Sequence, residues 1–120
     1  MTINQLWGRA IGTATTTDAT VTSLLVLTLP TTTVAVVRVV VTAKTGALSG
    51  AGWAMEGTFK NTAGTVAQIG ATLTTLSVQD AALLTAAVVF DVTGATARVR
   101  VTGIVATTIE WQATAEYPTN

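Results

Sequence analysis

The sequence predicts an all-β fold, a single β-sandwich of about eight strands. Of its 120 residues, 27 are Thr, 20 are Ala and 16 are Val. Thr and Val are β-branched, and such side chains suit a pleated sheet better than a helix. Apolar and polar residues alternate along much of the chain, and Gly, Pro and Asn punctuate this alternation. The jelly roll is the commonest eight-stranded sandwich, and a closed up-and-down barrel is the alternative.

The expected strands follow from the alternation and from the turn residues between them. In chain order they cover residues 6–15, 21–29, 34–42, 53–60, 66–73, 87–92, 98–103 and 109–117. In the fourth, Trp53, Met55, Gly57 and Phe59 face one way and polar residues face the other. The last strand repeats this pattern with Ile109, Trp111, Ala113, Ala115 and Tyr117. Each of these two strands therefore has one face in the core.

The third expected strand differs, because Val occupies both of its faces except at Arg38. Such a strand is central and covered on both sides. Pro30 ends the preceding strand, since it lacks the N–H that a ladder needs. Residues 61–64 and 93–95 are expected hairpin turns, in which Gly supplies a positive φ. Residues 78–86 are the one segment with helical character, a single turn capped by Asp80.

Composition restricts the range of partners. The chain is 49% hydrophobic with a mean hydropathy of +0.58, which favours burial of apolar surface between subunits. Its net charge is zero, so we expect neither a nucleic-acid nor a membrane partner. Arg98 and Arg100 form either a small basic patch or the solvated face of a strand. No signal peptide is recognisable, and the longest nearly apolar stretch, 81–90, is too short to span a bilayer.

The sequence offers little for catalysis. With no His and no Cys, disulfides, zinc–thiolate sites and the usual base of a catalytic triad are excluded. Lys44 and Lys60 do not lie in a Ser-x-x-Lys pattern. Glu110 and Glu116 share the outward face of the last strand, about 20 Å apart, which is too far for a glycosidase pair. We therefore expect no enzymatic activity, no cofactor and no metal site.

The remaining candidates for a binding site are the tryptophans. Trp53 and Trp111 could stack on sugar rings, but their place on alternating apolar faces favours the core. Trp7 lies in a Leu-Trp-Gly-Arg context near the N-terminus. Residues 1–9 are therefore a candidate docking arm, with Leu6, Trp7 and Arg9 as the partner-binding residues. A plain first strand of the sandwich is the alternative for this segment.

Two segments resemble a β-rich domain of tailed-bacteriophage virion proteins. The first runs from Gly52-Trp53 through Phe59-Lys60-Asn61 to Ile69-Gly70. The second is the closing Val99-Arg100-Val101-Thr102-Gly103 followed by Thr107-Thr108-Ile109-Glu-Trp111. The resemblance extends over roughly residues 10–117. Such domains form the ends of tail and head fibres, and small free-standing versions are capsid decoration (cement) proteins. Both kinds are commonly trimers.

What the resemblance implies is a structural protein of the virion. Fibre proteins usually carry a long N-terminal shaft, and this chain starts a few residues before its first strand, which favours the decoration role. We therefore expect one domain over residues 1–120, a homotrimer made in the host cytoplasm that binds the major capsid protein on the capsid surface and stabilises the head. The alternative is a tail- or head-fibre domain that binds a host receptor or glycan. Burial of Trp53 and Trp111 would argue against sugar stacking.

Overall fold

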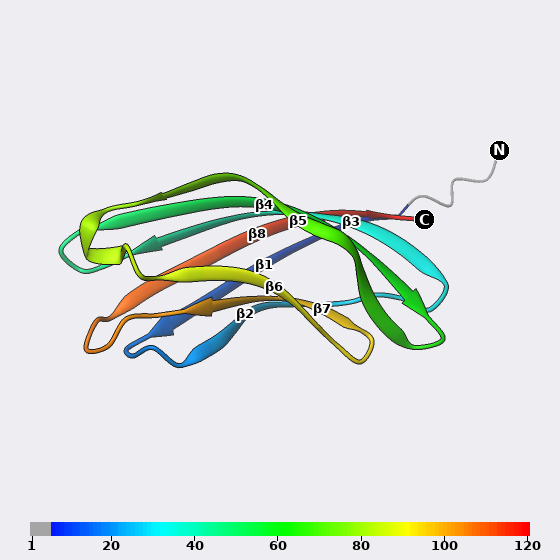
Figure 1. The fold of residues 1–120 in the computed structure, drawn as a ribbon, viewed down its shortest axis with the longest axis horizontal. Coiled ribbons are helices and arrows are strands. Elements are labelled where there is room, and N and C mark those ends of the chain that lie inside the picture. The colour runs from blue at the N-terminus through cyan, green and yellow to red at the C-terminus, as the bar shows by residue number, and fades with distance from the viewer. Residues whose placement is uncertain (1–5) are drawn as a thin grey trace.

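The computed structural model describes residues 6–120, with side chains from residue 8 onward. These residues form eight strands and one short 3-10 helix (Figure 1). The elements are β1 (Leu6–Thr16), β2 (Val21–Thr28), β3 (Thr33–Lys44), β4 (Gly50–Thr62), β5 (Thr65–Gln79), η1 (Ala81–Leu83), β6 (Ala87–Thr93), β7 (Thr96–Thr102) and β8 (Ile109–Thr119). Each expected strand is therefore present, and most extend further than expected.

The strands make two antiparallel sheets packed face to face. One has five strands in the order β1-β8-β3-β4-β5, and the other has three in the order β2-β7-β6. The β-sandwich prediction is confirmed, because two separate sheets are not a closed barrel. The neighbours β1-β8-β3 and β2-β7 are those of a jelly roll. The order then departs from it, since β4 and β5 extend the five-stranded sheet and β6 pairs with β7.

The core lies between the sheets and is lined by the alternate residues that the sequence predicted. On β3 these are Ala35, Val37, Val39, Val41 and Ala43, all buried. They are met by Leu25 and Leu27 of β2 and by Val99 and Val101 of β7. Because side chains alternate between faces, the register of each strand decides which residues are buried.

Trp53 and Trp111 belong to this core, as expected. They are 4% and 2% exposed, and their rings stack with centroids 5.5 Å apart. The indole Nε1–H of Trp111 donates a hydrogen bond of 2.9 Å to the hydroxyl of Thr16, which is also buried. The one polar atom of this side chain is thereby satisfied inside the sandwich.

The turns follow the predicted chemistry. Ala63 and Gly64 both have positive φ between the paired residues Thr62 and Thr65, which is the pattern of a type I′ hairpin. The side chain of Asn61 accepts a hydrogen bond from the Gly64 N–H and donates one to the Leu29 carbonyl. This buried amide therefore fixes the β4–β5 hairpin to the end of β2.

The predicted helical turn is present, but its cap is not. Residues 81–83 form the 3-10 helix η1, and Asp80 makes no side-chain cap to it. Its carboxylate instead accepts a hydrogen bond of 2.7 Å from the Gly50 N–H. Asp80 thereby connects the start of β4 to the end of β5.

The outer face of the five-stranded sheet is not covered by any part of the described chain. β3 is central, as predicted, but its Val34 and Val40 are exposed. The register of the strands places further exposed aliphatic side chains on this face: Ile11, Ile69, Leu73, Leu76 and Val78. The expectation that β3 is covered on both sides is therefore not met within residues 6–120.

Candidate functional site

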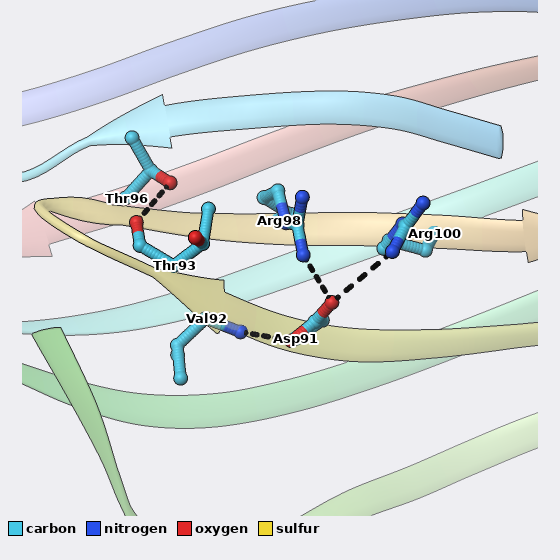
Figure 2. A network of polar contacts seen from close by, with 6 residues as sticks. All are labelled: Asp91, Val92, Thr93, Thr96, Arg98 and Arg100. Carbon is cyan, nitrogen blue, oxygen red and sulfur yellow. Dashed lines mark hydrogen bonds and ion pairs between the residues drawn. The ribbon is translucent and has the colours of Figure 1, made fainter.

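A compact polar cluster lies on the outer face of the three-stranded sheet. It consists of Asp91 on β6 and of Arg98 and Arg100 on β7 (Figure 2). β6 and β7 form a hairpin whose register pairs Asp91 with Arg98. Because Val99 and Val101 of β7 point into the core, the arginines between and beside them point outward.

One carboxylate oxygen holds the cluster together. Oδ2 of Asp91 accepts a short hydrogen bond from Nη2 of Arg98 and a longer one, 3.5 Å, from Nη1 of Arg100. Oδ1 of Asp91 accepts the backbone N–H of Val92 at 2.6 Å. Both arginines therefore share one acceptor atom, and the contact of Arg100 is at the limit of hydrogen-bonding distance.

The charges of the cluster do not balance. Two guanidinium groups share one carboxylate, so the cluster carries one positive charge in excess. The side chains of Arg98, Arg100 and Asp91 are 21%, 28% and 35% exposed, so the charges are only partly hydrated. The Nε atoms of both arginines are buried and have no hydrogen-bond partner. A buried donor without an acceptor costs about 1–3 kcal/mol.

The cluster also sets the ionisation of Asp91. Partial burial raises the pKa of this carboxyl, but the hydrogen bonds from Arg98, the Val92 N–H and Arg100 together outweigh it. The net effect is a pKa below the ordinary value of an aspartate. Asp91 therefore stays ionised, and holds the two guanidinium groups, throughout the neutral range.

The surroundings of the cluster combine hydroxyl and aliphatic groups. Val26 pairs with Arg98 in the β2–β7 register, and Val89 pairs with Arg100 in the β6–β7 register; both valines are exposed. The Thr96 hydroxyl donates to the Thr93 carbonyl at the hairpin turn. This surface offers charged donors beside small apolar flanks, a mixture suited to a ligand that is both polar and carbon-rich.

The residues of the predicted docking arm lie elsewhere. Leu6 and Trp7 belong to β1, and their backbones pair with Thr119 and Pro118 of β8. Arg9 forms an exposed ion pair of 3.0 Å with Glu116 on the outer face of the five-stranded sheet. Residues 1–5 of the arm, and the side chains of Leu6 and Trp7, lie outside the described part of the chain. Docking through this segment stays a prediction, and Arg9 is not brought near Arg98 or Arg100.

A second charged feature crosses the five-stranded sheet. Arg9, Glu116, Arg38 and Glu56 stand side by side on four neighbouring strands, so that positive and negative charges alternate across the face. Arg38 pairs with Glu56 at 2.8 Å. A hollow of about 320 Å³ opens beside this row, and one of about 470 Å³ lies beside the Lys44–Glu110 pair. These exposed pairs bring little stability but define the charge pattern of the face.

Sequence reasoning missed Asp91 as part of a site. It identified Arg98 and Arg100 as a basic patch or a solvated strand face, and gave Asp91 no role. The signal was nevertheless available, because a two-residue turn between Thr93 and Thr96 sets Asp91 directly opposite Arg98. What the sequence could not show is that these charges are half-buried.

Residues 6–120 contain neither a cluster of potential metal ligands nor a membrane-spanning helix. No group of three or more acidic side chains lies close enough together to hold a metal ion. None of the helices in this part of the chain is long and apolar enough to cross a membrane.

The described fold has a counterpart in a solved structure. The structure is similar to part of a solved tailspike protein, gp49 of the Acinetobacter baumannii bacteriophage Fri1, a capsular polysaccharide depolymerase. The TM-score is 0.54 at 15% sequence identity, and the match covers 94% of this chain but 18% of that one. No known protein family matches the sequence. No curated protein matches it either.

This similarity corrects one expectation. The sequence predicted a protein without enzymatic activity, whereas the tailspike that its fold resembles is a depolymerase, which is an enzyme. The prediction relied on the absence of His, Cys and a close carboxylate pair in 120 residues. That reasoning could not take account of a fold that also occurs as a small part of a much longer enzyme.

Proposed function

We propose that this chain is a β-sandwich module of a tailed-phage adhesion protein, of the tail-fibre or tailspike kind, and that it binds polysaccharide on the host surface. The observation that carries the proposal is the fold, which matches part of a phage tailspike over 94% of this chain. The same observation favours the fibre alternative over the capsid decoration role. Nothing in the structure or in the similarity supports a cement protein.

The site that would contact sugar is polar and not aromatic. Stacking on Trp53 or Trp111 is excluded, because both rings lie in the core. On the described surface, the Asp91–Arg98–Arg100 cluster brings two arginine side chains together at one carboxylate. Hydrogen bonds from charged groups to sugar hydroxyls and carboxylates are strong and directional, so this cluster can replace aromatic stacking as a source of affinity.

The proposal includes self-association, since a fibre or spike presents several copies of each module. The exposed aliphatic side chains of the five-stranded sheet provide a surface for this, and a homotrimer remains our expected state. The polar cluster lies on the opposite sheet. Binding of sugar and contact between copies would therefore use different faces.

The direct test is binding of the purified, fluorescently labelled chain to an array of bacterial capsular and outer-membrane polysaccharides. We expect retention on a subset of these polysaccharides and no co-sedimentation with emptied phage heads. Co-sedimentation with heads, together with no retention on any polysaccharide, would overturn the proposal in favour of the decoration role. Release of reducing ends from the retained polysaccharides, measured in parallel, reports directly on cleavage.

A further inference from the structure

We propose that the Asp91–Arg98–Arg100 cluster is a binding site for the carboxylate of an acidic sugar, such as the uronate residue of an anionic polysaccharide. The inference depends on the proposed function and adds the chemical class of the ligand. It starts from the excess positive charge of the cluster, which one ligand carboxylate would neutralise. It specifies Arg100 as the residue that takes the ligand.

The hydrogen-bond inventory distinguishes the two arginines. Arg98 donates a hydrogen bond to Oδ2 of Asp91, and Arg100 contacts the same oxygen atom. Arg100 has only its 3.5 Å contact. The Nε–H of each arginine is buried without an acceptor, so the two residues differ in their contact to Asp91 alone. Rotation of the Arg100 side chain therefore breaks only one weak hydrogen bond. It presents a free edge of the guanidinium, with two parallel N–H donors, to a ligand.

The geometry of that edge favours a carboxylate. A guanidinium edge matches the two oxygens of a carboxylate in a bidentate pair, and such pairs are among the strongest hydrogen bonds in proteins. Asp91 keeps its ionised form beside the site and holds Arg98 in place. Asp91 also repels an anion, so a singly charged group fits the site better than a phosphate, which carries more negative charge.

The flanks favour a sugar as the carrier of this carboxylate. Val26 and Val89 are exposed and pair in register with Arg98 and Arg100, so an apolar group stands beside each charge. A sugar ring presents C–H surfaces for such flanks and hydroxyls for the remaining N–H donors. A fully hydrated small anion would gain nothing from the two valines.

The test compares an oligogalacturonate with its neutral methyl ester, by isothermal titration calorimetry and by NMR chemical shifts of the purified chain. We expect binding of the acid, weakened by salt, and at least tenfold weaker binding of the ester. Arg100→Gln should lower the affinity for the acid by tenfold or more. Arg38→Gln removes an exposed arginine from the other sheet and should leave the affinity unchanged.

Folding of the variants is checked by near-UV circular dichroism. Arg100→Lys is a second variant that keeps the charge but not the two-pronged edge, and we expect an intermediate affinity. Equal binding of the acid and the ester, or equal losses in Arg100→Gln and Arg38→Gln, would overturn the assignment. The assignment would also be overturned if the oligogalacturonate changed NMR chemical shifts only at residues outside β6 and β7.

The failure of this inference can be told apart from the failure of the proposed function. If the polysaccharide array retains the chain and Arg100→Gln binds it equally well, the module binds glycans elsewhere and only the carboxylate site is wrong. If neither the array nor the oligogalacturonate binds, both proposals fail together.

Discussion

At the scale of single residues, the pair of Trp111 and Thr16 shows how a nearly neutral sandwich accommodates a buried polar group. The indole N–H and the threonine hydroxyl are both inside the core and bond only across the β1–β8 pair. Because water does not reach them, removal of either partner leaves the other with an unmet hydrogen bond.

We expect Thr16→Val to lower the free energy of unfolding by about 1–3 kcal/mol, because it leaves the indole N–H buried without an acceptor. The change keeps the side-chain volume and the β-branch. Urea unfolding followed by tryptophan fluorescence measures the loss. Thr15→Val, at the neighbouring exposed position, is the matched control and should have little effect. Equal losses in the two variants would contradict the assigned role of the hydrogen bond.

Asp91 gives a prediction about pH. Its pKa is lower in the folded chain than in the unfolded one, so its contribution to stability is present above pH of about 4 and is lost as the pH falls through the folded pKa. Asp91→Asn should therefore be less stable than the parent chain at pH 7, and the two should converge in acid.

Urea unfolding of both chains between pH 2 and pH 7 checks this expectation. A difference in stability that stays constant over the whole range would show that Asp91 acts through packing and not through its charge. At low pH the two arginines repel each other equally in both chains, so the comparison isolates the carboxylate.

At the scale of elements, the corner between the two sheets depends on β1 lying close against β2. A Cβ atom added at Gly12 would lie 2.1 Å from the backbone carbonyl oxygen of Leu24. Leu24 is at a bulge in the pairing of β2 with β7, where the strand bends toward β1. A glycine is therefore needed here for close approach.

We expect Gly12→Ala to destabilise the fold by about 1–3 kcal/mol, because backbone atoms must move to make room. Gly46→Ala is the control, since no atom lies within 4 Å of the added methyl group, and it should cause no destabilisation. Thermal unfolding of the two variants measures the difference. A Gly12 variant as stable as the Gly46 variant would show that β1 can move away from β2 at no cost.

The elements also show what sequence reasoning can and cannot reach. The inward faces of β4 and β8 were predictable. On β4, for example, the alternation of Trp53, Met55 and Phe59 with polar residues indicates a strand with one buried face. The length of β5 was not predictable. Neither face of β5 is buried beyond Gly70. No alternation of apolar and polar residues is therefore imposed on this part of the sequence. The Asp80 cap was wrong because Gly50, 30 residues away, competes for that carboxylate.

At the scale of the whole molecule, the outer faces of the two sheets differ in what they expose. The three-stranded sheet carries the half-buried Asp91–Arg98–Arg100 cluster on its outer face. The five-stranded sheet ends in β5, whose outer face presents Ile69, Leu73, Leu76 and Val78. Exposed apolar strands at a sheet edge favour association with another chain, which is consistent with the mean hydropathy of +0.58.

We expect the chain to self-associate through this surface. Light scattering coupled to size exclusion should give a mass of about 37 kDa for a trimer of 12.2 kDa chains. Leu76→Lys should shift the mass to that of the monomer, because it places an unpaired charge in the contact. Val89→Lys, an exposed valine on the other sheet, is the control and should leave the mass unchanged. A parent chain that is itself monomeric would refute the expectation.

Fold class and candidate site differ in how far the sequence determines them. Eight strands and a shared core follow from local alternation and turns. The sheet order does not, because the pairing of β1 with β8 joins residues more than 90 positions apart. The sequence indicated the two arginines of the charged cluster, Arg98 and Arg100. It did not indicate Asp91, because the position of this carboxylate follows from the β6–β7 register. Burial of Trp53 and Trp111 was predictable from their alternating apolar faces, and it removes these rings as candidates for stacking on sugar.

The pairing of β1 with β8 has a mechanical consequence. The ladder runs from Leu6 opposite Thr119 to Thr16 opposite Ile109, so the outer ends of both strands leave the sandwich at the same side (Figure 1). A force that pulls these two ends apart loads a single pair of hydrogen bonds at a time and peels the strands open, as a zipper opens. The β1–β8 pair therefore resists such a force less well than a force that shears the two strands along their length, which loads all of their hydrogen bonds together.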